Sequence, residues 1–154
     1  MSPRLIAEQH TISRDALRIA IVSDTHAYLD ARIEQLIAEC DYAIHAGDVM
    51  DARILARMRP RQQLFAVAGN NDEQGVWCGK EERFTRRLPD IVELELPSGR
   101  ICVEHGHRFG FAQPDHEGLR AAHPEARLVI YGHTHKQLID QSRDPWIANP
   151  GLPE

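Results

Sequence analysis

Two pairs of side chains that can bind a metal ion stand out in this 154-residue sequence. Asp24 and His26 are separated by one threonine, and His133 and His135 are separated in the same way. In a tight loop after a strand, two residues at this spacing can point into one cleft. Imidazole and carboxylate together suit Mn, Fe, Zn or Ni better than Mg or Ca, which prefer oxygen ligands throughout. The two pairs therefore predict a transition-metal site.

Further polar clusters could complete such a site: Gly47-Asp48, Gly69-Asn70 and His105-Gly106-His107. Together with the two pairs they give seven candidate ligands: Asp24, His26, Asp48, Asn70, His105, His133 and His135. Seven ligands are too many for one tetrahedral ion, but they fit two ions that share a bridging carboxylate. Such a pair of ions, about 3.5–4 Å apart, activates water and clamps the oxygens of an in-line displacement at phosphorus.

Nearly every one of these clusters follows a short apolar run, which is the pattern of a buried strand. The first three runs span residues 17–22, 42–46 and 63–68, and two amphipathic segments lie between them. Asp30 and Asp51 can cap helices in those segments. The alternation indicates βαβ crossovers and a parallel sheet. Because the carboxyl ends of the strands in such a sheet line one crevice, we expect the clusters to converge.

The second half of the chain adds antiparallel pairing. Residues 91–96 and 101–104 are apolar runs joined by a Pro-Ser-Gly-Arg turn, which predicts a hairpin. The later pattern predicts one short helix and three strands, in the order 115–122, 127–131, 136–140 and 145–148. Residues 71–87 have the composition of a loop. The length favours a single α/β domain over 1–154, in which residues 1–16 form an extension before the first strand.

The motifs occur in the order DxH, GD, GN, H and GHxH between about Ile19 and Gly151, and this order resembles the calcineurin-like metallophosphoesterase superfamily. The short chain, the His-Gly-His at 105–107 and the Gly-His-Thr-His-Lys at 132–136 resemble its small YfcE-type phosphodiesterase branch. The resemblance implies a four-layer α/β/β/α sandwich of two mixed sheets. It also implies an enzyme that hydrolyses phosphodiesters or, in some members, phosphomonoesters.

The resemblance also implies a role for each candidate ligand. A first metal ion would be held by Asp24, His26 and His135. A second would be held by Asn70, His105 and His133. Asp48 would bridge the two ions, and a bridging hydroxide would attack phosphorus. Three of these residues would serve catalysis as well as binding: Asp48, Asn70 and His133. The ions would be divalent transition metals, with manganese expected first and nickel, iron or zinc as alternatives.

One departure from the family pattern concerns the proton donor. Many members read Gly-Asn-His, but Asn71 stands where that histidine would protonate the leaving group. An amide cannot supply the proton, and general acid catalysis typically contributes about 10²–10⁴-fold. We therefore expect slow turnover or a preference for acidic leaving groups such as phenolates. Near the ligands, Asp72 is expected to fix the loop, and His107 to support a ligand or contact the phosphate.

A second departure lies at the C-terminal end of the sequence. Family members continue into further strands after Asn149-Pro150-Gly151, whereas only three residues follow here. The second sheet would then be incomplete at its C-terminal end, with an edge that invites pairing. The extension over residues 1–16 or another subunit could cover that edge, so a homo-oligomer remains open.

Composition and charge exclude other classes. The formal net charge of −5 at pH 7 argues against binding nucleic acid by bulk electrostatics. The arginines between 53 and 61 favour a solvated face, since no aromatic residues are interleaved with them. No apolar run reaches the length of a membrane span, and the first fourteen residues do not form a signal peptide. A cytoplasmic protein acting on a small phosphoester is expected.

Two functions fit these observations. The first is a phosphodiesterase with two metal ions, and the second is a metal-binding interaction scaffold of the same fold with little or no catalysis. Intact Asp24, His26 and Asp48 favour the enzyme. Asn70 could also be a simple turn residue, since Gly-Asn is turn-prone. Trp77 could stack on substrate, anchor a lid or pack in the core.

Overall fold

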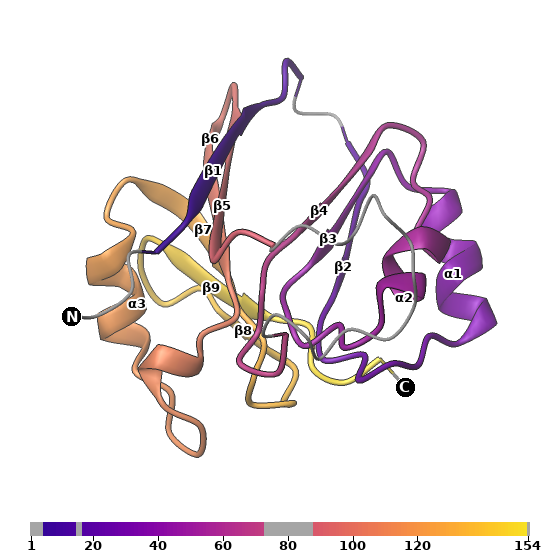
Figure 1. Ribbon diagram of the computed structural model, residues 1–154. Coiled ribbons are helices and arrows are strands. Elements are labelled where there is room, and N and C mark those ends of the chain that lie inside the picture. Colours follow the sequence, from indigo (N-terminus) through magenta and orange to yellow (C-terminus); the bar gives the residue numbers. More distant parts are fainter. Residues whose placement is uncertain (1–4, 15–16, 73–87, 154) are drawn as a thin grey trace.

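The computed structural model describes residues 5–14, 17–72 and 88–153. Within these ranges the elements are, in chain order, β1 (Ala7–Thr11), β2 (Ile19–Val22), α1 (Ala31–Ala38), β3 (Tyr42–His45), α2 (Ala52–Arg57), β4 (Gln63–Ala66), β5 (Ile91–Leu96), β6 (Gly99–Glu104), η2 (His107–Phe109), α3 (His116–Ala122), β7 (Ala126–Ile130), β8 (Leu138–Asp140) and β9 (Trp146–Asn149). The strands form two separate sheets (Figure 1). The prediction of an α/β chain with two sheets is confirmed.

The smaller sheet holds the predicted βαβ units. Its strand order is β2-β3-β4, and both pairings are parallel. The side chains of Asp30 and Asp51 accept hydrogen bonds from the backbone at the starts of α1 and α2, as predicted. The two helices pack on the outer face of this sheet, where Ile37, Ile54 and Leu55 are buried against strand residues (Figure 1).

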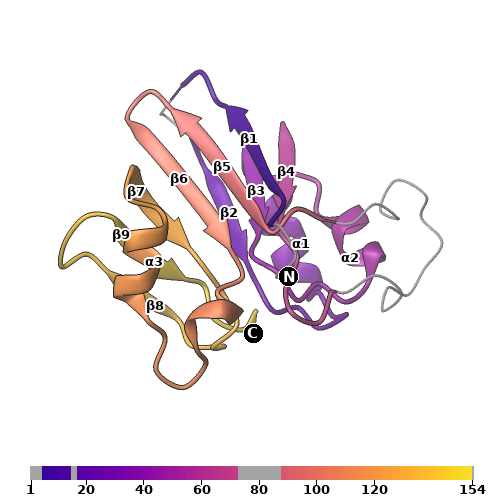
Figure 2. The same cartoon turned by 60° about the vertical axis from the view of Figure 1, so that its left-hand side comes forward.

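The larger sheet is mixed, with the strand order β1-β5-β6-β7-β9-β8. The predicted hairpin forms between β5 and β6, and β8 pairs antiparallel with β9. The remaining neighbours run parallel. Helix α3 covers the outer face of this sheet through Leu119, which is buried with Val129 and Tyr131 (Figure 2). The weak strand signals at 136–140 and 145–148 thus correspond to β8 and β9.

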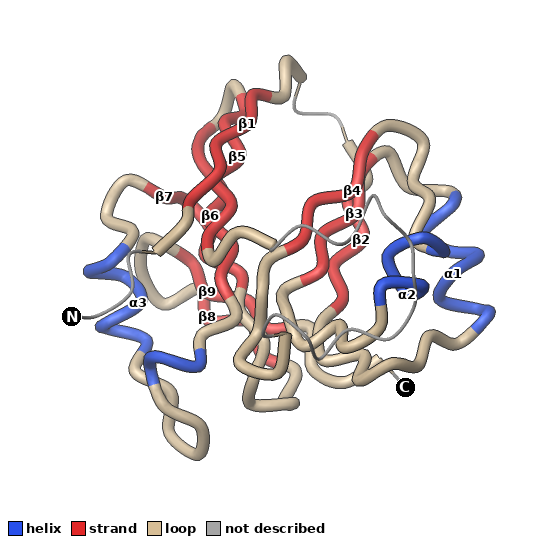
Figure 3. The backbone as a smooth tube through the Cα atoms, in the orientation of Figure 1, coloured by secondary structure: helices blue, strands red, loops and turns tan. Residues whose placement is uncertain are grey.

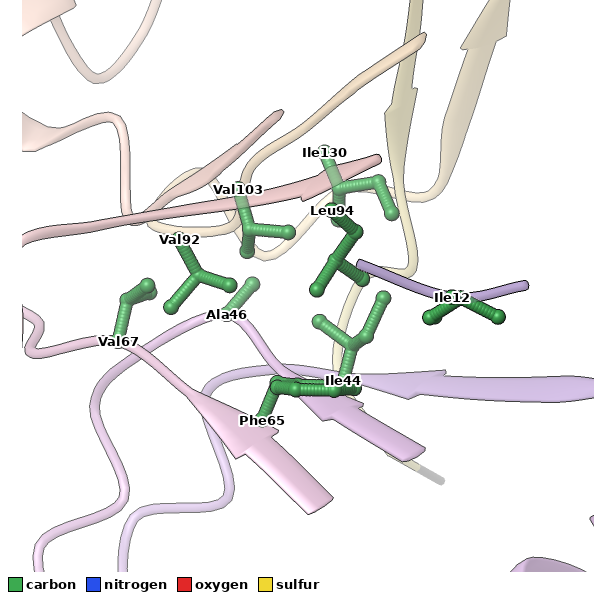
Figure 4. Packing of buried hydrophobic residues seen from close by; sticks show 9 residues of the cluster. All are labelled: Ile12, Ile44, Ala46, Phe65, Val67, Val92, Leu94, Val103 and Ile130. Carbon is green, nitrogen blue, oxygen red and sulfur yellow. The ribbon is translucent and has the colours of Figure 1, made fainter. Parts of the chain in front are cut away.

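The main apolar core lies between the two sheets, which face each other in Figure 3. Its buried side chains, shown in Figure 4, are Ile12, Ile44, Ala46, Phe65, Val67, Val92, Leu94, Val103 and Ile130. Burying one large aliphatic or aromatic side chain contributes about 1.5–3 kcal/mol relative to leaving it exposed. The core therefore fixes one sheet against the other, and this sets the relative position of the loops at the strand ends.

The N-terminal extension contains a strand, so the expectation that the first strand follows residue 16 is wrong. Strand β1 pairs in parallel with β5, from Ala7 opposite Ile91 to Thr11 opposite Glu95 (Figure 2). The sequence of β1 gives little sign of this, because four of its five residues are exposed. Its backbone pairing and the burial of Ile12 just after it hold it in place. Within the described residues, β1 and β8 are then the edges of the larger sheet.

A membrane span was not expected, and none of the helices in the described ranges is long and apolar enough to cross a bilayer.

Candidate metal centre

The polar clusters follow the ends of strands from both sheets, and hydrogen bonds bring their loops together. The backbone N–H of Asp24 donates to Gly47 O at 2.9 Å, which joins the loop after β2 to the loop after β3. Gly132 N donates to His105 O at 3.0 Å, which joins the loops after β7 and β6. The sheets are linked in turn, because His133 N donates to Asp24 Oδ2 at 3.1 Å.

The candidate ligands in these loops adopt an uncommon backbone conformation. Five have a positive φ: Asp24 (55°), His26 (47°), Asp48 (57°), His133 (65°) and His135 (63°). A non-glycine residue in the left-handed region costs about 1–2 kcal/mol and is found mostly where surrounding structure enforces it. Such strain clusters at functional sites, so the backbone marks this edge of the molecule independently of the side-chain types.

One group of donor atoms consists of Asp24, His26 and His135, whose ligand atoms all lie within 4.8 Å of one another. The Nε2 atoms of His26 and His135 are 3.3 Å apart. Asp24 Oδ1 lies 3.5 Å from His135 Nε2 and 3.9 Å from His26 Nε2. Three donors converging on one point could hold a metal ion, and they are the three that the family resemblance assigns to a first ion.

A second group consists of Asp24, Asp48 and His105, and all three residues are buried. His105 Nε2 lies 3.5 Å from Asp48 Oδ2 and 3.7 Å from Asp24 Oδ1. Asp48 Oδ2 is also 3.7 Å from His26 Nε2, which belongs to the first group. Both carboxylates therefore reach donors of both groups, and the two groups form one continuous centre.

The protonation of His105 suits a metal ligand. Its Nδ1 is 2.8 Å from the carbonyl oxygen of Ala46, so Nδ1 carries the proton and donates it. Its Nε2 and the Oδ1 of Asp24 are buried and have no hydrogen-bond partner among the described residues. Two buried, unpartnered atoms that face each other are costly unless a cation or a proton lies between them. A divalent ion fits this arrangement, with Ala46 O orienting the imidazole from behind.

The electrostatics of the second group point the same way. Burial raises the pKa of the Asp48 carboxyl, but the nearby His105 imidazole and the hydrogen bonds from Asn71 outweigh it and hold that pKa well below its usual range. Burial lowers the pKa of His105, yet the neighbouring Asp48 reverses this and leaves that pKa raised. The pair thus stabilises a positive charge at this point, which a proton or a metal ion can supply.

Asn71 and Asp72 hold the loops in place. Asn71 donates to both carboxylate oxygens of Asp48, from its backbone N at 3.0 Å and from Nδ2 at 2.9 Å. Asp72 accepts hydrogen bonds from the backbone N–H groups of Val49, Met50 and Gly69. Asp72 therefore ties the loop after β4 to the loop after β3, and Asn71 orients the carboxylate that reaches both donor groups.

Sequence reasoning missed two supports of Asp24. The hydroxyl of Ser23 donates to Asp24 Oδ2 at 2.5 Å. Gly132 passes so close that a Cβ there would lie 1.8 Å from Ser23 Oγ and 2.7 Å from Asp24 Oδ2. Only glycine fits at this approach. The Gly-His-Thr-His motif begins at Gly132, so this close approach explains why glycine precedes the histidine pair.

His45, in the strand that precedes Asp48, is fully buried. Its Nδ1 accepts a hydrogen bond from Gly47 N at 3.1 Å, so its Nε2 carries the proton and donates to Thr25 Oγ1 at 3.0 Å. Burial lowers the pKa of His45 to about 3, and His105 adds to the effect. A neutral imidazole thus connects the loops that carry Asp24 and Asp48.

The remaining predicted site residues lie around the centre. The ring of His133 is 5.1 Å from that of His105, and the ring of His107 is 5.6 Å from His105. His133 is outside the two converging groups of carboxylates and imidazoles found in the described residues. The Asn70 side chain is exposed.

Other sequence features have structural explanations or lie elsewhere. Arg57 pairs with Glu34 at 2.7 Å, which agrees with a solvated arginine face. His116 contacts the Tyr131 hydroxyl, as an ordinary structural histidine would. Trp77 lies outside the described residues.

The sequence profile of the calcineurin-like phosphoesterase superfamily domain matches residues 17–154. The chain belongs to this superfamily. The probable metallophosphoesterase MJ0623 of Methanocaldococcus jannaschii is 32% identical over 142 residues, which cover 88% of this chain and 67% of that protein. Phosphodiesterase YfcE of Escherichia coli is 25% identical over 153 residues, which cover 88% of this chain and 78% of YfcE. The resemblance that the motifs predicted is therefore confirmed.

Two solved structures share the fold. The structure of YfcE from E. coli has a TM-score of 0.59 at 21% identity and covers 89% of this chain and 80% of its own. Vps29 from Entamoeba histolytica, solved with Zn²⁺, has a TM-score of 0.64 at 17% identity. The match covers 87% of this chain and 73% of the Vps29 chain. At these identities the likeness concerns the fold alone.

Proposed function

We propose that this protein is a phosphodiesterase that uses two divalent transition-metal ions, with manganese first among them. The observation that carries the proposal is the pair of donor groups that share Asp24 and enclose the unpartnered atoms Asp24 Oδ1 and His105 Nε2. Membership of a phosphoesterase superfamily gives the reaction class, and relatives named phosphodiesterases support the diester.

The distances support a division of roles. His26 and His135 would hold one ion together with Asp24. His105 would hold the other, and Asn70 and His133 would complete its shell as the family pattern implies. Asp48 would serve both ions, since its Oδ2 lies 3.7 Å from His26 Nε2 and 3.5 Å from His105 Nε2. Metal ions bound here would supply Lewis acidity toward the phosphoryl oxygens and a nucleophile from water at neutral pH.

The protein's own groups then set what the site can do. Asn71 cannot protonate a leaving group, and its backbone N–H and side-chain Nδ2 both donate to Asp48. His107, whose ring centroid lies 5.6 Å from that of His105, would contact the phosphate. Esters with acidic leaving groups, which depart without a proton, are therefore the best substrates. Alkyl esters are hydrolysed more slowly by about the 10²–10⁴-fold that a general acid contributes.

The test is hydrolysis of bis(p-nitrophenyl) phosphate by purified protein supplied with Mn²⁺, Ni²⁺, Fe²⁺ or Zn²⁺, together with the metal content by elemental analysis. We expect two equivalents of bound metal and metal-dependent turnover. Asp48→Ala should abolish turnover, because it removes the carboxylate proposed to bridge the two ions. Retained activity in that variant would refute the bridging role.

The second candidate is a metal-binding interaction scaffold of the same fold. Asn71 at the position of the proton donor favours it. Two bound equivalents of metal without turnover on aryl diesters, whichever divalent metal is supplied, would support the scaffold and contradict the enzyme.

A further inference from the structure

Phe111 stands at the rim of the metal centre. Its ring centroid is 5.2 Å from that of His133 and 6.3 Å from that of His135, and the planes cross at 77° and 81°. Both histidines come from the loop after β7, whereas Phe111 follows η2. The side chain is 57% exposed. An open aromatic surface therefore lies beside two proposed metal ligands.

The neighbouring Phe109 shows what a packed phenylalanine looks like in the same segment. Phe109 packs against the buried cluster under α3, and the guanidinium of Arg108 lies 4.5 Å from its ring centroid. Phe111 is absent from the three buried apolar clusters of the described residues and from the residues packed against them. Its contacts are instead with His133 and His135. Packing in the core explains the phenylalanine at position 109 but does not explain the phenylalanine at position 111.

We propose that Phe111 determines substrate specificity by packing against an aromatic group esterified to the phosphate. This inference rests on the proposed function, because the metal centre must hold the phosphoryl group. With the phosphorus at the donor groups, an ester substituent that extends past His133 and His135 reaches the ring of Phe111. Aromatic pairs are favourable at centroid separations of about 4.5–7 Å, and an aromatic ester group packed against Phe111 would lie within this range.

The chemistry at position 71 favours the same substrates. Because Asn71 supplies no proton, the leaving group must be stable as an anion, and phenols are far more acidic than alkyl alcohols. An aromatic ester group thus meets both conditions: it can leave without protonation, and it can pack against Phe111. The substrate class is therefore phosphoesters that carry an aryl or similar aromatic group next to phosphorus.

Binding of two non-hydrolysable phosphonates tests this without relying on turnover. Dissociation constants for phenylphosphonate and methylphosphonate are measured by calorimetry on the Mn²⁺-loaded full chain and on three variants. Phe111→Ala should weaken phenylphosphonate binding by about two- to tenfold, the worth of one aromatic pair, and leave methylphosphonate unchanged. Phe111→Tyr should restore the preference. Trp146→Ala, which removes another exposed aromatic ring at the start of β9, should leave both constants unchanged.

The outcomes separate this inference from the proposed function. If both phosphonates bind and Phe111→Ala leaves their ratio unchanged, or weakens both equally, the role of Phe111 is overturned and the metal-centred function stands. If the metal-loaded protein binds neither phosphonate, the centre does not hold a phosphoryl group, and both proposals fall.

Discussion

Ile44 and Asp48 lie four residues apart at the end of the same strand, and both are almost completely buried. Ile44 packs in the apolar core between the sheets. Asp48 lies in the loop after this strand, where it faces His105, and like four other proposed ligands it has a positive φ angle. Apolar burial at Ile44 stabilises the folded state, whereas the strained backbone and the buried charge at Asp48 destabilise it. The difference teaches that the core stabilises the fold and that the strand ends depend on that stability.

The core should show the largest effect on stability. Leu94→Ala removes a fully buried side chain from between the sheets and should lower the free energy of unfolding by about 2–5 kcal/mol, since a cavity remains. Leu36→Ala, at an exposed leucine of α1, is the matched control and should change it by less than about 0.5 kcal/mol. Urea unfolding with EDTA present measures both. Similar losses in the two variants would contradict the division between core and surface.

In contrast to the core substitution, a substitution in the metal centre should not destabilise the metal-free protein. Asp24→Asn removes one of two neighbouring buried carboxylates and keeps an acceptor for Ser23 and the His133 N–H. Without metal, this variant should be at least as stable as the wild type, because it removes a buried carboxylate whose Oδ1 has no hydrogen-bond partner among the described residues. It should lose the thermal stabilisation that Mn²⁺ gives the wild type, and its kcat should fall by about 10²–10³-fold.

Melting temperatures with EDTA and with Mn²⁺, and the rate on bis(p-nitrophenyl) phosphate, test this prediction. A metal-free variant that melts well below the wild type would show that Asp24 contributes mainly to folding. In that case the proposed difference between the stabilising core and the destabilising strand ends would not hold for Asp24.

A smaller effect on kcat is expected at Gly132, where the close approach of the backbone, rather than a charge, positions the ligands. Gly132→Ala places a methyl group against Ser23 Oγ and Asp24 Oδ2 and should cost up to about 10²-fold in kcat, since a displacement of 1 Å can cost that much. Gly99→Ala, at φ 145° in the hairpin turn, is the control and should reduce stability without changing metal affinity. Equal metal affinities in the two variants, by calorimetry, would argue against the packing role of Gly132.

Much of this arrangement is predictable from the sequence, because apolar runs and the polar residues that end them are local patterns. The hairpin, the caps Asp30 and Asp51, and the convergence of strand ends all follow from such patterns. Strand β1 does not, because its exposed residues carry no periodic signal and its pairing partner lies 84 residues away. The hydrogen bonds of Asn71 to Asp48 are equally hidden, since they depend on how two distant loops meet.

The smallest predicted effect comes from His45, which belongs to neither the apolar core nor the ligand groups. Its imidazole stays neutral in the folded protein down to about pH 3, whereas in the unfolded chain it takes up a proton near pH 6.5. Between those values the unfolded state binds one more proton, so this residue makes the protein less stable as pH falls. Below about pH 6.5 the loss approaches about 1.4 kcal/mol per pH unit.

His45→Gln should remove that part of the pH dependence, since glutamine does not titrate. Thr25→Val is the matched control, because it deletes the hydrogen-bond partner of His45 but keeps the imidazole buried. It should lower stability by a similar amount at every pH. Urea unfolding in EDTA at pH 7.5, 6 and 5 gives the three slopes. If wild type and His45→Gln lose stability equally on acidification, the destabilisation comes from the histidines of the proposed metal centre instead, and His45 does not contribute to the pH dependence.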